Sequence, residues 1–182
     1  MRRAHVLLLF LFPLTMAVLP GCSPNGAAIK PVERVDLRRF MGDWYVIAHI
    51  PSFVERNAYD AVESYALMPD GTVQTTFHYR NGSFTAPLHA LHPTAYIETA
   101  KGNAVWRMQF VWPIKAQYVI AYIDPEYQQT IIARDVRDYV WIMARSPSIS
   151  TEDYAKLVGK VVDLGYSADK LRTVPQRAEL QR

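Results

Sequence analysis

Residues 105–123 read VWRMQFVWPIKAQYVIAYI, and this stretch decides the fold. Aromatic and β-branched side chains dominate it, and these residue types favour strands over helices. Trp106, Met108 and Phe110 fall on one face of an extended chain, and the apolar Val105 and Val111 lie on the other. Because no helical period competes with this alternation, the stretch predicts two strands, at residues 105–111 and 118–123.

The same pattern continues on both sides, from residue 44 to residue 145. It predicts eight strands, at residues 44–50, 61–68, 72–79, 95–99, 105–111, 118–123, 130–133 and 139–144. Three of the turns between them offer a glycine, at Gly71, Gly82 and Gly102. Eight strands with short connections favour an all-β fold, an up-and-down antiparallel barrel, since closing the sheet removes its exposed edges. A β-sandwich is the alternative. The interior of an eight-stranded barrel holds either one small ligand or packed side chains.

One helix follows the strands. Ser150 is a suitable N-cap with Asp153 three residues later, and Gly165 is placed to end the helix. The apolar residues between these ends share one helical face: Tyr154, Leu157, Val158, Val161 and Leu164. The sequence therefore predicts a single C-terminal α-helix that packs on the barrel wall.

The first 21 residues have the character of an export signal. Arg2 and Arg3 precede an apolar run that is short for a membrane span. The run ends in Leu19-Pro20-Gly21-Cys22, which resembles the lipobox of bacterial lipoproteins and implies cleavage before Cys22 and acylation of its thiol. Cys22 is the only cysteine, so it has no disulfide partner within the chain. An unmodified thiol is the alternative.

These features divide the chain into three parts. We expect a signal peptide at residues 1–21, a lipidated Cys22 and flexible tether at residues 22–34, and a barrel domain at residues 35–182. Several acyl chains would make the anchor durable, because each buried methylene contributes about 0.8 kcal/mol. Ser23 stands where an aspartate would resemble an inner-membrane retention signal. We therefore expect an outer-membrane protein, anchored on the periplasmic face.

The charge balance argues against nucleic acid as a partner. The net charge is +3, but residues 1–21 hold two arginines and no acid, and without them 18 basic and 17 acidic side chains remain. No cluster of lysine and arginine lies among aromatic residues on one face. The length beyond the tether suits one domain.

Two separated motifs resemble signatures of the lipocalins. Residues 40–45, Phe-Met-Gly-Asp-Trp-Tyr, resemble the G-x-W turn that leads into the first strand, with Gly42 and Trp44. Residues 139–147 resemble the last strand, with Arg145, and residues 118–127 resemble the middle motif. The match is most similar to the bacterial group called Blc and covers residues 35–174. It implies that the Arg145 guanidinium lies over the Trp44 indole and seals the barrel floor, a cation–π contact of about 0.5–2 kcal/mol.

Strand alternation then predicts which side chains face the cavity. If Trp44 and Arg145 mark the floor, the inward residues on their strands are Val46, Ala48, Ile50, Met143, Trp141 and Tyr139. On other strands we expect the wall residues Phe77, Tyr79, Met108 and Phe110. This apolar lining suits a lysophospholipid or fatty acid. The resemblance implies lipid storage or transport for membrane maintenance under stress, without a cofactor, and homodimers in some members.

Three other functions are weighed against this one. The only cysteine lies in the lipobox and no G-x-S-x-G elbow is present, which argues against an enzyme. His78, His89 and His92 lie close in sequence, but loop histidines without cysteine or a helical i, i+4 spacing are usually solvated, so no metal is expected. The third alternative is a structural lipoprotein whose barrel is filled by its own aromatic side chains.

Overall fold

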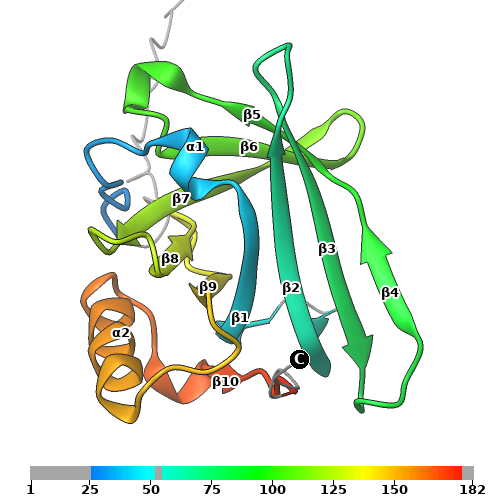
Figure 1. The fold of residues 1–182 in the computed structure, drawn as a ribbon. Coiled ribbons are helices and arrows are strands. Elements are labelled where there is room, and N and C mark those ends of the chain that lie inside the picture. The colour runs from blue at the N-terminus through cyan, green and yellow to red at the C-terminus, as the bar shows by residue number, and fades with distance from the viewer. Residues whose placement is uncertain (1–25, 52–54, 178–182) are drawn as a thin grey trace, which may run out of the picture.

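The computed structural model describes residues 26–51 and 55–177 (Figure 1). Most of them form one antiparallel sheet that curls on itself. Its strands are β1 (Gly42–Ile50), β2 (Ala58–Leu67), β3 (Val73–Asn81), β4 (Leu88–Leu91), β5 (Thr94–Ile97), β6 (Val105–Val111), β7 (Ile114–Ile123), β8 (Gln129–Ala133), β9 (Val140–Ala144) and β10 (Arg172–Thr173). The helical elements are α1 (Leu37–Phe40), α2 (Thr151–Asp163) and the short 3-10 helices η2 (Thr99–Lys101) and η3 (Ala168–Lys170).

The sheet closes into the predicted eight-stranded barrel. Around the barrel the strands follow the order β1, β2, β3, β5, β6, β7, β8 and β9, each paired with the next. Strand β9 returns to pair with β1, with Tyr45 opposite Ala144 and Ile50 opposite Val140. Strands β4 and β5 share one position, because both pair with β3. The two-residue β10 pairs with Ala48 and His49 of β1, beyond the residues of β1 that pair with β2. The all-β prediction is confirmed, and the sandwich alternative is wrong.

Two of the predicted strands differ most from the observed ones. The prediction has a single strand at residues 95–99, whereas β4 precedes β5 and the two are separated by His92 and Pro93. Proline has no backbone N–H to give to the sheet, so the ladder breaks there. Strand β7 begins at Ile114, earlier than predicted, because the β6–β7 hairpin is tight and pairs Val111 with Ile114.

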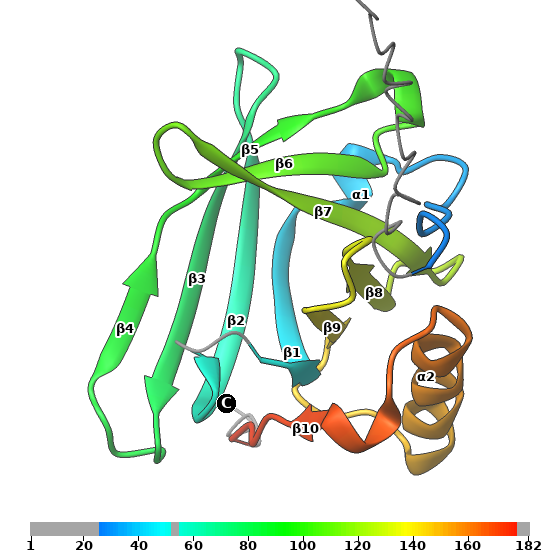
Figure 2. The ribbon, with the colours of Figure 1, turned by 180° about the vertical axis from the view of Figure 1, so that it is seen from behind.

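The predicted C-terminal helix is confirmed as α2, outside the barrel (Figure 2). The Ser150 hydroxyl accepts a hydrogen bond from the Asp153 backbone N–H at 3.0 Å, which caps the first turn. Leu157 and Val161 are buried against the outward side chains of the wall, where they form a second apolar core. The first core lies inside the barrel.

A shift of register in β1 changes which of its side chains face inward. Val46 lies opposite Met143, but the next paired residue on β1 is Ala48, opposite Ile142. Directly paired residues point to the same side of a sheet. Ala48 and Ile50 therefore belong to the core under α2, and the prediction that they face the cavity is wrong. The alternation rule fails here because one extra residue in a strand reverses every side chain after it.

Part of the predicted tether lies against the barrel. The Ile29 amide donates to Asp135 Oδ1 at 2.8 Å, and the Ile29 side chain is buried. The Val32 amide donates to the Ile120 carbonyl. The chain is thus fixed to the barrel several residues before position 35. Within residues 26–51 and 55–177, no helix has the length and apolar character needed to cross a bilayer.

Candidate functional site

The closed end of the barrel is sealed by Arg145 and Trp44. The guanidinium carbon lies 3.9 Å from the centroid of the Trp44 ring, which is fully buried. The guanidinium donates to the carbonyl oxygens of Asp43 at 2.6 Å, Arg39 at 2.7 Å and Met41 at 2.8 Å. Burial lowers the pKa of Arg145 from its ordinary value, but the group stays cationic in proteins. This is the pairing that the sequence predicts.

Gly42 makes the turn into β1 possible. Its φ is +88°, a conformation that residues with a Cβ rarely adopt. A Cβ at this position would also lie 3.5 Å from Arg145 Nη1. The glycine of the motif is thus needed for backbone conformation next to the arginine.

Above this floor the barrel interior is filled with aromatic rings. Trp106 stacks on Tyr118 with ring centroids 5.3 Å apart, and Phe40 contacts both Trp106 and Trp44. The hydroxyls of Tyr65 and Tyr118 form a short hydrogen bond in the same layer. The alternative of a self-filled barrel therefore holds for the lower part of the interior.

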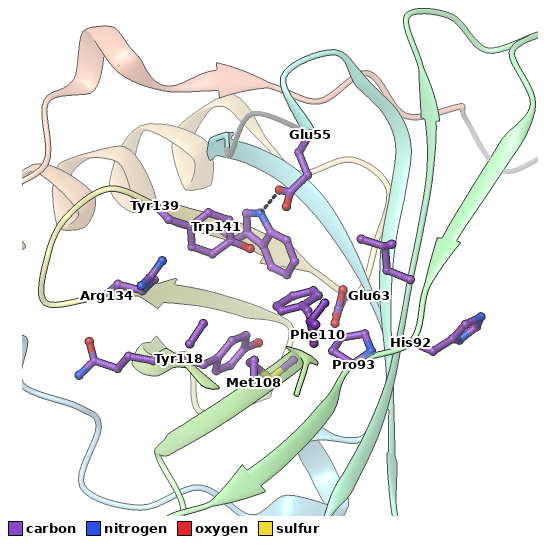
Figure 3. A pocket seen from close by; sticks show the side chains of 14 residues that line it. Glu55, Glu63, His92, Pro93, Met108, Phe110, Tyr118, Arg134, Tyr139 and Trp141 are labelled. Atoms are coloured by element: carbon purple, nitrogen blue, oxygen red, sulfur yellow. Dashed lines mark hydrogen bonds between the residues drawn. The ribbon is translucent and has the colours of Figure 1, made fainter. Parts of the chain in front are cut away.

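The upper part is hollow, with a cavity of about 470 Å³ (Figure 3). Four of the predicted wall residues line it: Met108, Phe110, Tyr139 and Trp141. Four others belong to the inner core without lining the cavity: Val46, Phe77, Tyr79 and Met143. Phe77 and Tyr79 still shape the wall, because Phe77 packs on Trp141 with centroids 5.2 Å apart. Whether these residues contact a ligand remains a prediction.

Two carboxyl groups in the cavity wall were missed from the sequence. Glu63 is 1% exposed, and its Oε2 has no hydrogen-bond partner among the described residues. Glu55 accepts a hydrogen bond from Trp141 Nε1 at 3.2 Å and lies 3.6 Å from His49 Nδ1. Glu63 faces inward because it lies opposite Trp44 in the sheet, and this pairing cannot be read from the sequence of its own strand. No sequence pattern places Glu55, which lies between β1 and β2 in the chain.

The Glu63 carboxyl is strongly perturbed. Burial raises its pKa well above the ordinary value, the charge of Glu55 raises it further, and only a hydrogen bond with Thr75 acts in the other direction. Burial also raises the pKa of Tyr139, Tyr65 and Tyr118, which keeps these phenols protonated. The cavity thus has a largely apolar wall that also carries two carboxyl groups, those of Glu63 and Glu55.

The mouth of the cavity is bordered by loops and by the β6–β7 hairpin. Arg134 lines the cavity and forms an ion pair with Asp138 at 3.1 Å. On the hairpin, Phe110 and Val111 line the cavity and continue into the exposed Trp112 and Ile114. Trp112 is 82% exposed, so an apolar surface extends from the cavity to the outside.

The remaining candidate features of the sequence are the histidines considered for metal binding and the cysteine of the lipobox. Within the described ranges, no group of three or more histidine, cysteine, aspartate or glutamate side chains could hold a metal ion. His89 stacks on Tyr79, and His92 Nδ1 lies 3.3 Å from the Thr76 hydroxyl. Cys22 lies outside the described residues.

Comparisons with known proteins agree with this geometry. The Lipocalin-like domain family matches residues 35–176. Temperature-induced lipocalin-1 of Arabidopsis thaliana is 34% identical over 158 residues, which cover 81% of this chain and 83% of the relative. Outer membrane lipoprotein Blc of Escherichia coli is 26% identical over 166 residues, with 90% of each chain covered.

Solved structures show the same fold. Insecticyanin of the tobacco hornworm Manduca sexta superposes with a TM-score of 0.65 at 16% identity, covering 83% of this chain and 85% of that one. The cockroach allergen Per a 4 has a TM-score of 0.60 at 19% identity, with 79% of this chain and 89% of that chain covered. At such identities the likeness concerns the fold alone.

Proposed function

Because this chain belongs to the lipocalin family, whose barrels bind small hydrophobic ligands, we propose that it binds single-chain lipids and stores or transports them for membrane maintenance. The observation that carries the proposal is the cavity of about 470 Å³, lined by Met108, Phe110 and Trp141 and open at the hairpin. Ligand pockets for small molecules measure about 300–1,000 Å³. The cavity thus suits part of one acyl chain and has little room for two.

Competition with the membrane favours the same ligands. Burial of apolar surface stabilises by about 25 cal/mol per Å², but a bilayer offers the lipid an interior of the same kind. The acyl chain therefore adds little net preference for the barrel. Lipids that leave a bilayer readily, such as lysophospholipids and fatty acids, are the ones that a protein can collect.

The location follows from the relatives and from the leader. The bacterial relatives are outer membrane lipoproteins, which supports an outer-membrane address for this chain. Acylation of Cys22, attachment on the periplasmic face, homodimers and a role under stress are parts of the proposal. In this proposal the protein has no cofactor and no enzymatic activity.

Native mass spectrometry of the full chain tests the ligand class. The chain is released from detergent in the presence of a lysophospholipid, a fatty acid or a diacyl lipid of matched chain length. We expect the two single-chain lipids to bind and the diacyl lipid to bind at least about tenfold more weakly, a difference of about 1.4 kcal/mol.

A matched pair of variants shows whether binding uses the cavity. Ala116 lines the cavity, so Ala116→Trp should fill it and abolish binding. Val162 is exposed on α2, outside the barrel, and Val162→Trp should leave binding unchanged. Equal binding of all three lipids, unaffected by Ala116→Trp, would overturn the proposal.

A further inference from the structure

The Glu63 carboxyl in the cavity wall is only partly paired: it has a hydrogen bond with Thr75, but one of its oxygens has no partner among the described residues. Glu63 is almost fully buried, its side chain lines the cavity, and its Oε2 lacks a hydrogen-bond partner among the described residues (Figure 3). A buried polar group without a partner destabilises the folded protein, and a buried unpaired charge destabilises it more. A protein that only held the end of an acyl chain here would gain from an apolar residue.

The surroundings of Glu63 add negative charge and aromatic surface. Glu55 lies in the same cavity wall and acts on Glu63 by charge. The cavity is also lined by the rings of Trp141, Tyr118 and Phe110. The basic groups in its wall have partners of their own, since Arg134 pairs with Asp138 and the His92 ring with Thr76. Carboxylates together with aromatic faces form an environment that favours a cation.

We propose that the cavity binds amphiphiles that carry a cationic nitrogen, with the nitrogen at Glu63 and the apolar part directed toward the mouth. This inference rests on the proposed function and goes beyond it, because it adds alkylamines and quaternary ammonium compounds to the single-chain lipids as ligands of the same cavity. The nitrogen contacts the Glu63 carboxylate and the faces of Trp141 and Tyr118. The chain follows Phe110 toward the exposed apolar side chains of the β6–β7 hairpin.

In this orientation the cationic nitrogen pairs with Glu63 and the apolar chain contacts the apolar side chains near the mouth. A carboxylate that entered first would meet the Glu63 carboxyl, and a methyl terminus that entered first would leave Glu63 Oε2 without a partner. A cation removes this cost and stabilises the ionised form of the carboxyl. Among alkyl compounds of equal length, the cation should therefore bind most tightly, the alcohol less tightly and the carboxylate most weakly.

Calorimetric titration of the full chain in lipid nanodiscs tests the order, with empty nanodiscs subtracted. The probes are octyltrimethylammonium, octanol and octanoate at neutral pH. Octyltrimethylammonium has no N–H to donate, so its affinity reports the effect of its charge without a hydrogen bond. We expect it to bind about tenfold or more tighter than octanol, with octanoate the weakest.

Glu63→Gln keeps the shape of the side chain and removes its charge. We expect this variant to lose about tenfold or more in affinity for octyltrimethylammonium and to bind octanol as the wild type does, which also shows that the variant is folded. Glu152→Gln, on the exposed face of α2, is the control and should bind all probes unchanged.

Each other outcome overturns the inference. If octanol binds as tightly as the cation, or if Glu63→Gln weakens both equally, the carboxyl serves only as a hydrogen-bonding group and the cation site is wrong, while lipid binding stands. If no probe binds the wild type, the proposed function fails as well.

Discussion

The guanidinium of Arg145 does more than lie over an indole. It donates to backbone carbonyls that surround α1 and the turn into β1, including those of Arg39, Met41 and Asp43. A planar fork with five donors can reach these acceptors together, whereas an ammonium group cannot. The contact therefore holds the N-terminal segment onto the barrel floor.

Substitution of Arg145 should be costly even when the charge is kept. We expect Arg145→Lys to lower the free energy of unfolding by about 2–4 kcal/mol, because the carbonyls of Arg39, Met41 and Asp43 lose hydrogen bonds from a charged donor. Urea unfolding followed by tryptophan fluorescence measures the change. Arg107→Lys is the control: its partly exposed ion pair with Glu98 should contribute less than about 1 kcal/mol. A loss of similar size in both variants would contradict the special role of Arg145.

Residues whose role is set by local geometry could be predicted from the sequence. Gly42 is an example, because it needs its positive φ, whereas the contact between Trp44 and Arg145 was predicted from the resemblance to lipocalins. Glu63 was missed because a single acid in a strand normally marks a solvent-facing position. Its burial depends on the strand opposite, and a period of two does not reveal which of its two faces is inward.

For strands and helices too, features set by the local sequence could be predicted, and features set by pairing with a distant strand could not. The eight strand positions and the bounds of α2 follow from side-chain alternation, turn residues and a capping serine, all of which are local. The register shift in β1 is not local, since it is defined by the pairing of Ala48 with Ile142 rather than by any residue type. Two of the predicted cavity residues, Ala48 and Ile50, were wrong for this reason alone.

Arg137 connects three elements that are distant in sequence. Its guanidinium donates to the carbonyls of Ala27 at 2.7 Å and Leu164 at 3.1 Å, and also to that of Asp135. It thus joins the segment before the barrel, the β8–β9 loop and the C-terminal end of α2, where a cation also interacts favourably with the helix dipole.

Removal of this side chain should release the N-terminal segment without opening the barrel. Arg137 has a φ of +51°, so Arg137→Asn suits the test because asparagine tolerates this conformation. We expect the Ile29 amide to exchange hydrogen about tenfold faster or more, a change of about 1.4 kcal/mol in local opening, while amides of β6 and β7 stay protected. Unchanged exchange at Ile29 would show that Asp135 and the burial of Ile29 hold the segment alone.

As a whole, the molecule has two unlike ends. One is closed by Arg145, Trp44 and α1, and the other carries the cavity mouth beside the β6–β7 hairpin, which projects from the barrel (Figure 2). Four apolar residues of this hairpin are more than half exposed: Phe110, Val111, Trp112 and Ile114. Exposed apolar patches in soluble domains usually mark interaction sites. A lipid that passes between a bilayer and the cavity would follow this surface, because it avoids contact with water.

The hairpin should therefore control how fast a lipid moves, and the cavity how tightly it is held. We expect the double variant Trp112→Ser and Ile114→Ser to take up a fluorescent lysophospholipid from vesicles about tenfold more slowly, since less apolar surface covers the chain in transit. The dissociation constant measured without vesicles should stay within about twofold, because neither residue lines the cavity. Val136→Ser, at another exposed apolar position, is the control.

Sedimentation of the same variants shows whether the hairpin contacts a bilayer or a second copy of the chain. If uptake is slower and the mass of the protein is unchanged, the hairpin contacts the bilayer. If the variant changes a dimer to a monomer and leaves uptake unaffected, the hairpin contacts a second copy of the chain.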